Sequence, residues 1–438
     1  MSIGKVLRYT FPMDKETLKY VLQQHATRLL PVAAARTLQL PIDTGKVVTL
    51  VGIRRSGKTY LLYETMQRLV ASGVDRRRII YLNFEDDRLL PIKTRELDLL
   101  LRAHEELYPE MVGQRKFLFL DEVQNAPRWE SYVRRLHDTE NLRIYVTGSS
   151  SQLLKRELAT GLRGRSISFE VFPLSFREFL TFTGINHQSY SRSSESHMAA
   201  ALGEYLKVGG LPELVLADPI LRPQILQEYV TLVFYKDLIE RYRVSNPVVL
   251  RQLLKRCLGQ PATLLSTHKL YNEMRSLGLE LSKDTLYRYL DYLEESYLIF
   301  PLPIADRSIR KQAMNPKKLH AVDWALGYPF IPEQTIDVGR KLESAVFLHW
   351  RRQREDLAYM AGDHEIDLVV NGENPEILIN VAYSVVQPAT WEREMRALSW
   401  AAEKWPQAKR LLVVHEGAGQ ATPPGIETIE AWRYLSGE

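Results

Sequence analysis

The chain has 438 residues, of which 45% are hydrophobic and 25% charged, with a formal net charge of +5. This composition is that of a globular protein and excludes a collagen, a coiled coil or a disordered polymer as the whole chain. The length predicts about two to four domains, and the mildly basic balance permits a polyanionic partner without establishing one.

A single cysteine, Cys257, excludes a disulfide framework and a cysteine-based zinc site. We therefore expect a reducing, cytoplasmic compartment. Residues 1–20 carry several charges and no long apolar run, so we expect no signal peptide. No apolar stretch reaches the roughly 18 residues that a membrane span needs, so we expect no membrane association.

Residues 47–175 alternate short apolar runs with helical patterns, such as those at 58–71 and 129–136. This alternation predicts a parallel sheet that is covered by helices on both faces. We expect its strands at 47–52, 79–84, 116–121, 143–147 and 166–171.

A phosphate-binding motif follows the first of these strands. Residues 52–59 fit G-x-x-x-x-G-K-[ST] between an apolar strand and an amphipathic helix, which is the context that this P-loop requires. Its backbone N–H groups and the helix N-terminus bind phosphate. Lys58 reaches the β- and γ-phosphates, and the Thr59 hydroxyl ligates Mg²⁺. We expect ATP and Mg²⁺ as cofactors, with nucleotide contacts from Gly52, Arg54, Arg55, Ser56, Gly57, Lys58, Thr59 and Tyr60.

An apolar run at 116–120 ends in two carboxylates, Asp121 and Glu122. After a P-loop at this distance we expect Asp121 to hold Mg²⁺ and Glu122 to polarise the attacking water.

The next strand ends in hydroxyl residues, among them Thr147 and Ser149. Either of these two side chains could lie beside the γ-phosphate and the water. They could equally cap the following helix.

Arg163 and Arg165 follow in a glycine-rich turn. A planar guanidinium of this kind suits a finger that enters a neighbour's nucleotide site. The alternative is a solvated basic turn.

The order of these motifs resembles a large prokaryotic family of AAA+ ATPases that carry a winged-helix segment and a C-terminal domain of unknown function. Further landmarks of that family are matched at 172–179, 209–213, 235–241, 343 and 365–369. The resemblance covers about residues 30–430.

The resemblance implies an α/β fold with four parts. These are an AAA+ core with a catalytic glutamate (1–175), a helical lid (176–245), a winged helix (246–305) and a nuclease-like α/β domain (306–438). It places Gly209, Gly210 and Pro212 in the lid near the adenine. It also implies a homo-oligomer, with a hexameric ring expected, because a finger arginine acts on a neighbouring subunit.

Residues 246–305 carry helix-turn-helix spacing, with polar caps before 266–271 and 282–290 and a turn at 276–278. A strand at 297–301 would form the wing. We expect Lys283, Thr285, Tyr287 and Arg288 to contact DNA. The alternative is a protein-docking module.

The C-terminal domain resembles the PD-(D/E)XK nuclease scaffold, through Glu343 and Asp367. That chemistry needs a second metal-binding carboxylate and a lysine, where this chain has Asn380 and Ala382. We therefore expect a degenerate nuclease-like domain that has lost catalysis and binds DNA or a protein.

Two functions follow. The first is an ATP-hydrolysing AAA+ ring motor that translocates on, unwinds or remodels DNA, and so has helicase activity. The second is a nucleotide-dependent signalling or defence switch that recruits protein partners.

Overall fold

The chain divides into two compact units, Met1–Val171 and Phe172–Glu438. The computed structural model describes residues 15–31, 34–92, 96–149, 161–185, 192–419 and 421–437. Among these residues no helix has the length and apolar character needed to cross a membrane. The finer four-part division stays a prediction.

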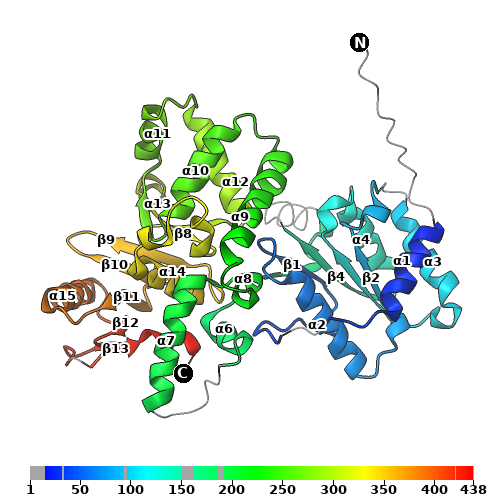
Figure 1. Cartoon of the computed structure of the whole chain (residues 1–438), viewed down its shortest axis with the longest axis horizontal. Coiled ribbons are helices and arrows are strands. Elements are labelled where there is room, and N and C mark those ends of the chain that lie inside the picture. Colours follow the sequence, from blue (N-terminus) through cyan, green and yellow to red (C-terminus); the bar gives the residue numbers. More distant parts are fainter. Residues whose placement is uncertain are drawn as a thin grey trace. The chain divides into compact units, whose positions relative to one another are not determined.

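The first unit is built around a five-stranded parallel sheet with the strand order β2-β3-β4-β1-β5 (Figure 1). All five strands predicted from the apolar runs are present. Its elements are α1 (Lys15–Thr27), β1 (Val47–Val51), α2 (Lys58–Ala71), β2 (Ile79–Asn83), α3 (Leu99–Leu107), β3 (Lys116–Asp121), α4 (Trp129–Thr139), β4 (Leu142–Gly148) and β5 (Ser166–Glu170).

Strands β1 and β3 are buried along their whole length, as continuous apolar runs in a parallel sheet require. The core includes Leu50 of β1, Leu62 and Met66 of α2, and the stacked rings of Phe119 and Tyr145. Strand β4 lies between β1 and β3, so the carboxyl ends of these three strands meet at one edge of the sheet. Ligand sites of α/β proteins form at such an edge.

The second unit begins with helices and a three-stranded antiparallel sheet of order β6-β8-β7. Ser266 and Ser282 cap α11 and α12, as the helix-turn-helix spacing predicts. The elements are α6 (Phe176–Phe182), α7 (Arg192–Val208), α8 (Pro212–Leu216), α9 (Arg222–Leu232), a π-helical segment (Val233–Glu240), α10 (Pro247–Gly259), β6 (Thr263–Leu265), α11 (Thr267–Ser276), α12 (Lys283–Glu295), β7 (Ile299–Leu302), α13 (Ile309–Met314) and β8 (Lys317–Ala321).

The unit ends with a mixed five-stranded sheet of order β13-β12-β11-β10-β9 (Figure 1). Strands β9, β10 and β11 are antiparallel, whereas β11, β12 and β13 are parallel. The elements are α14 (Val338–Arg351), β9 (Leu357–Ala361), β10 (Glu365–Val370), β11 (Ile377–Ser384), α15 (Pro388–Lys404), β12 (Lys409–Glu416), β13 (Ile426–Glu430) and α16 (Ala431–Ser436).

The sequence pattern missed several strands of the second unit. Strands β6, β8, β9 and β13 are only three to five residues long, and β13 has no alternating apolar pattern. The expected wing strand starts two residues late, because Tyr297 adopts a left-handed conformation with φ 57° and therefore precedes β7.

Candidate active site

The P-loop wraps around the end of β1 with a backbone that glycine makes accessible. Gly52 has φ 148°, and a Cβ on it would lie 2.3 Å from the carbonyl oxygen of Val171. Gly57, the residue before α2, has φ 100°. Side chains at these two positions would clash or strain the backbone, so the loop can close tightly only with glycine.

Two P-loop side chains are prepared for an anionic ligand. Lys58 is 4% exposed, and its ammonium donates 3.0 Å hydrogen bonds to the carbonyl oxygens of Gly52 and Ile53. The buried hydroxyl of Ser56 has no hydrogen-bond partner among the described residues. The phosphate oxygens of a bound nucleotide would supply hydrogen-bond acceptors for the Ser56 hydroxyl and for the Lys58 ammonium, so both side chains fit a phosphate ligand.

Asp121 lies at the centre of a hydrogen-bond network at the end of β3. Its carboxylate accepts hydrogen bonds from Thr59 at 2.8 Å, from Tyr81 at 2.9 Å and from Thr147. Burial raises the pKa of Asp121, the charge of Glu122 adds to this effect, and the hydrogen bonds oppose it. A cation beside Asp121 would reverse the shift by stabilising the charged form. Thr59 and Asp121 therefore fit the expected Mg²⁺ position.

Glu122 leaves the strand in a left-handed conformation with φ 54°, which turns its side chain toward the P-loop. Its Oε1 lies 3.9 Å from the Lys58 Nζ. The backbone N–H of Glu122 donates a 2.9 Å hydrogen bond to the Thr147 hydroxyl. The structure thus brings Lys58, Thr59, Asp121, Glu122 and Thr147 together at the edge that the sheet order provides.

Thr147 and Ser149 both lie inside this site. The Ser149 hydroxyl accepts a 3.3 Å hydrogen bond from Gln124, and both hydroxyl residues are buried. The alternative, capping of the helix expected to follow them, involves residues 150–160, which lie outside the described part of the chain.

Two contacts at the site have no motif in the sequence. Tyr81 reaches Asp121 because β2 pairs with β3, so strand order was the signal needed to find it. Arg36 donates a 2.8 Å hydrogen bond to the Ser56 carbonyl from a segment that precedes β1.

Arg54, Arg55 and Tyr60 were also expected to contact the nucleotide. Arg54 forms a 2.8 Å ion pair with Glu85, and Arg55 adopts φ 58°. Tyr60 is 53% exposed, and its ring packs against that of Tyr63 in a T-shaped, edge-to-face arrangement. Their expected nucleotide contacts stay predictions.

The glycine-rich turn separates its two arginines. Arg165 forms a 2.7 Å ion pair with Asp138 of the same chain. Arg163 is exposed at the turn with φ 46°, while the neighbouring Leu162 is fully buried and anchors the turn. Arg163 is therefore the more accessible of the two, and a finger role for either arginine stays a prediction.

The Gly209–Gly210 element lies in the second unit, where Asp323 holds it. The Gly210 N–H donates a 2.7 Å hydrogen bond to Asp323, and a Cβ on Gly209 would lie 2.3 Å from the same carboxylate. Pro212 begins α8. The expected contacts of Gly210 and Pro212 with the adenine stay predictions.

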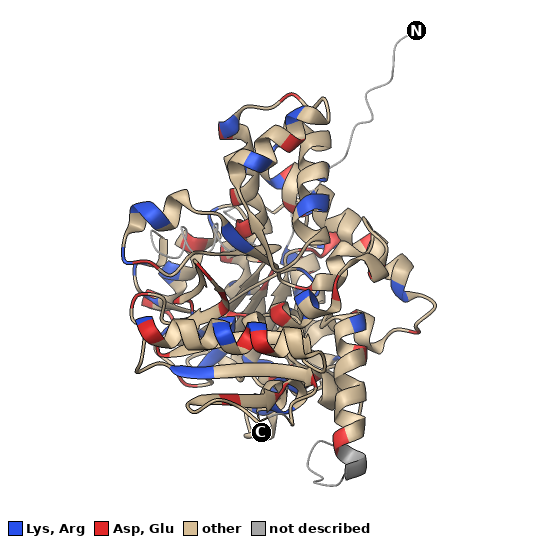
Figure 2. Ribbon diagram, turned by 90° about the vertical axis from the view of Figure 1, so that its left-hand side faces the viewer, with Lys and Arg blue, Asp and Glu red and all other residues tan. Residues whose placement is uncertain are grey.

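The exposed face of α12 carries Lys283, Tyr287 and Arg288, while Thr285 hydrogen-bonds to the Ser282 cap. On the other face of α12, Leu286, Tyr289 and Leu293 are buried, and Leu290 is partly buried. Figure 2 shows basic and acidic residues interspersed over the helices of this unit.

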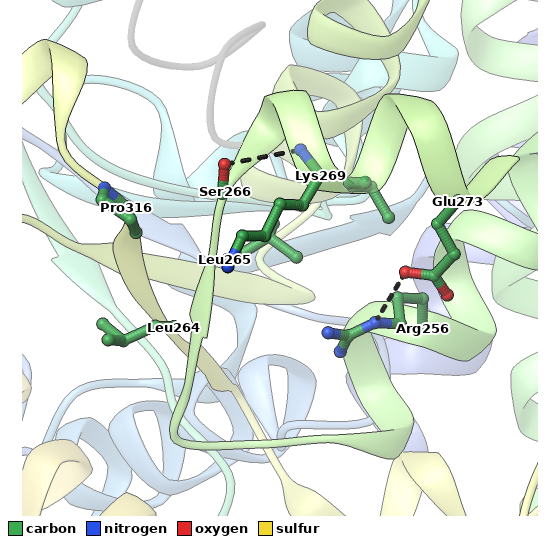
Figure 3. A pocket seen from close by; sticks show the side chains of 8 residues that line it. Arg256, Leu264, Leu265, Ser266, Lys269, Glu273 and Pro316 are labelled. Carbon is green, nitrogen blue, oxygen red and sulfur yellow. Dashed lines mark hydrogen bonds and ion pairs between the residues drawn. The ribbon is translucent and has the colours of Figure 1, made fainter. Parts of the chain in front are cut away.

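A pocket of about 160 Å³ lies between β6 and α11 (Figure 3). Arg256 and Glu273 form a 3.5 Å ion pair on one side, and Ser266 and Lys269 line the other. The pocket belongs to the second unit, and Lys58, Asp121 and Glu122 do not line it.

A buried lysine, Lys318, lies among the carboxylates of Glu343, Glu365 and Asp367. The ammonium of Lys318 lies 2.9 Å from Glu343, 2.5 Å from Glu365 and 3.0 Å from Asp367, and the lysine is 2% exposed. Burial alone would lower the pKa of Lys318, but the three carboxylates raise it. Burial and Asp367 raise the pKa of Glu343 to about 8.

The side-chain amide of Asn380 forms two hydrogen bonds in the same region. Its Oδ1 accepts a 3.3 Å hydrogen bond from the Asp367 N–H, and its Nδ2 donates a 2.7 Å bond to Glu394. Among the residues described, no group of three metal-ligating side chains is arranged to hold a metal ion. These residues do not fit the divalent cation of a nuclease, because an ammonium already contacts their carboxylates.

Two families match the chain. A family described as "AAA domain" matches residues 44–180, which contain the site around Lys58 and Asp121. A family described as "domain of unknown function (DUF8612)" matches residues 199–332.

Relatives and solved structures extend the comparison. The uncharacterized protein MJ1544 of Methanocaldococcus jannaschii is 33% identical over 404 residues, covering 90% of this chain and 87% of that protein. An uncharacterized protein of Haemophilus influenzae is 29% identical over 398 residues, covering 90% and 95%. The Walker-type ATPase PABY2304 of Pyrococcus abyssi matches 75% of this chain and 99% of its own, with a TM-score of 0.43 and 15% identity.

Proposed function

Because the chain belongs to the same family as the M. jannaschii protein MJ1544 and matches an AAA domain at residues 44–180, we propose that it is an ATPase that hydrolyses ATP with Mg²⁺. We further propose that it forms a ring-shaped homo-oligomer and acts on DNA. The observation that carries the proposal is the convergence of Lys58, Thr59, Asp121 and Glu122 at one sheet edge. A second family model, the domain of unknown function DUF8612, matches residues 199–332.

Each side chain of the site has a distinct role in this reaction. Lys58 neutralises charge on the β- and γ-phosphates, and the P-loop N–H groups orient them. Thr59 and Asp121 would hold Mg²⁺, which would supply the positive charge that neutralises the phosphate oxygens. Glu122 accepts a proton from the attacking water, and Thr147 orients the Asp121–Glu122 pair through its two hydrogen bonds.

Action on DNA is supported by the capped α11–α12 pair and by the exposed Lys283 and Arg288. An α-helix of this kind enters the major groove while basic side chains contact phosphates. The test is the ATPase rate with no DNA and with single-stranded, duplex and branched DNA. We expect at least one DNA form to raise the rate, and equal rates in all four conditions would contradict a DNA motor.

Variants separate nucleotide chemistry from DNA action. Lys58→Ala should abolish nucleotide binding or turnover, while Glu122→Gln should bind ATP without hydrolysing it. Particle images of Glu122→Gln with ATP would display the ring. If that variant with ATP stays monomeric at micromolar concentration, the ring assembly is wrong.

A nucleotide-dependent switch that recruits protein partners is the second candidate. The observation that favours it is the mixture of acidic and basic residues on the winged-helix region, because a DNA-binding face is usually basic (Figure 2). Slow turnover, no DNA affinity and a stable co-purifying protein would support this function over the first.

The C-terminal nuclease-like domain is a non-catalytic scaffold in either case. The chain lacks the Glu-x-Lys pair at Asn380 and Ala382, and Lys318 neutralises part of the remaining carboxylate charge. Without catalysis, this domain serves to bind DNA or a protein.

A further inference from the structure

Gln124 links the ends of two neighbouring strands at the nucleotide site. Its side-chain Nε2 donates a 2.5 Å hydrogen bond to the Glu122 carboxylate and a 3.3 Å bond to the Ser149 hydroxyl. Glu122 follows β3 and Ser149 follows β4, which pair directly. The amide therefore fixes the Glu122 side chain relative to the end of β4.

The other half of this amide is unsatisfied. Gln124 Oε1 is buried and has no hydrogen-bond partner among the described residues. The orientation of the amide follows from chemistry, because an ionised carboxylate accepts hydrogen bonds and only the NH₂ group can donate to Glu122. A water that enters with the nucleotide can donate the hydrogen bond that this oxygen lacks among the described residues.

We propose that Gln124 positions Glu122 for proton abstraction and that its Oε1 accepts a hydrogen bond from the attacking water in the ATP-bound state. This inference rests on the proposed ATP hydrolysis. A water held by both Glu122 and Gln124 has one hydrogen directed to each side chain, so its oxygen lone pair is directed toward the γ-phosphate. Orientation of this kind accounts for a large part of the acceleration in phosphoryl transfer.

The step balances without a further reactant. The water oxygen forms a bond to the γ-phosphorus, and the bond from that phosphorus to the β,γ-bridging oxygen breaks with its electron pair leaving on ADP. One water proton passes to Glu122. Gln124 gains and loses no proton, so it orients the water and does not act as a base.

The test compares Gln124→Ala with Gln114→Ala, a matched control. Gln114 is exposed, and its side-chain amide donates a 2.9 Å hydrogen bond to the Glu110 carbonyl in the same unit. Single-turnover hydrolysis and ATP affinity are measured on the full chain. We expect Gln124→Ala to slow hydrolysis on the order of 10–100-fold, with ATP affinity unchanged within about twofold, and Gln114→Ala to match the wild type.

Two further readouts exclude a merely structural role. In Gln124→Glu, the second carboxylate opposes ionisation of Glu122, so the acid limb of the pH–rate profile should move to higher pH. Ser149→Ala, which removes the other acceptor of the amide, should slow hydrolysis less and should not add its full effect in the Gln124→Ala background.

The outcomes separate this inference from the proposed function. If the wild type neither binds nor hydrolyses ATP, both are wrong. If the wild type hydrolyses ATP and Gln124→Ala does so at the same rate, or if Gln124→Glu leaves the pH–rate profile in place, only the role of Gln124 is wrong. The role of Gln124 is also wrong if Gln124→Ala lowers the melting temperature and weakens ATP binding enough to account for the slower hydrolysis.

Discussion

Tyr81 donates a hydrogen bond of 2.9 Å to Asp121 from the neighbouring strand. The tyrosine hydroxyl is thus a third donor to a carboxylate that Thr59 and Thr147 also hold. Because these donors favour the charged form, they oppose the rise in the pKa of Asp121 that burial causes.

Tyr81→Phe removes this donor and leaves the ring in place. We expect hydrolysis to slow about 10–100-fold and to require more Mg²⁺, since a hydrogen bond to a charged group contributes roughly 1.5–3 kcal/mol. A Mg²⁺ titration of the ATPase rate measures both effects. Tyr63→Phe is the control, because it removes a neighbouring hydroxyl that lies 3.4 Å from the Tyr81 hydroxyl. Identical titrations of the two variants would refute the role of Tyr81.

Arg163→Ala should slow ATP hydrolysis about 10³-fold if the arginine completes a neighbour's site. Arg165→Ala should have a smaller effect, because Arg165 is paired with Asp138 in its own chain. The decisive measurement mixes Arg163→Ala subunits with Lys58→Ala subunits. Activity of the mixture above the sum of its parts demonstrates action between subunits, and strict additivity argues against it.

Lys283→Ala and Arg288→Ala should each weaken DNA binding and reduce the slope of log affinity against log salt by about 0.9. Fluorescence anisotropy at several salt concentrations measures this slope. Lys236→Ala is the control, because Lys236 is an exposed lysine that pairs with Glu240 outside both α12 and the C-terminal sheet. Unchanged slopes in both α12 variants would favour protein docking by the winged helix.

Lys318→Met removes the ammonium and leaves three carboxylates within a small volume. We expect this variant to bind a divalent cation such as Mn²⁺ that the wild-type cluster does not bind, because carboxylate oxygens are its preferred ligands. Calorimetric titration without nucleotide measures this gain, and Lys318→Met/Asp367→Asn should lose it. Equal Mn²⁺ binding by wild type and Lys318→Met would mean that Lys318 does not block the cluster.

Asp323 predicts a pH dependence of stability. Burial raises its pKa to about 6 from 3.8, so the folded state binds the proton more tightly than the unfolded chain does. Its stabilising contribution is complete below pH 3.8 and is lost as the pH rises through about 6, by about 3 kcal/mol at most.

The comparison with Asp323→Asn isolates this effect. Urea denaturation followed by tryptophan fluorescence reports mainly the second unit, because only Trp129 of the seven tryptophans lies in the first. We expect the stability advantage of the wild type over Asp323→Asn to shrink between pH 4.5 and pH 7. A pH-independent difference would show that Asp323 keeps its ordinary pKa.

The sequence predicts the residues of the site whose positions depend on local structure. Lys58 and Thr59 follow from one motif, and Asp121 and Glu122 follow from the end of one apolar strand. Tyr81 could not be found in this way, because its contact depends on β2 lying beside β3. Strands β1, β2, β3 and β4 were found because buried parallel strands are continuous apolar runs, whereas the more exposed β5 alternates polar and apolar residues.

Contacts between distant segments were beyond this reasoning. Lys318 meets Glu343 and Asp367 only because β8, α14 and β10 pack together in the C-terminal part. Glu343 and Asp367 were identified through the nuclease resemblance, whereas a single lysine in the short strand β8 carries no motif. The link between Gly210 and Asp323 likewise joins residues 113 positions apart.

The hydrogen bond from Arg36 to the Ser56 carbonyl bears on how the ATPase part can be isolated. The matched AAA domain begins at residue 44, so a fragment cut there would retain every motif residue but lose this guanidinium. The smallest ATPase fragment that keeps this contact should therefore begin upstream of Arg36. A fragment that starts at residue 44 would keep the complete P-loop sequence but should bind phosphate less tightly, because the Ser56 carbonyl would lose its hydrogen bond from Arg36.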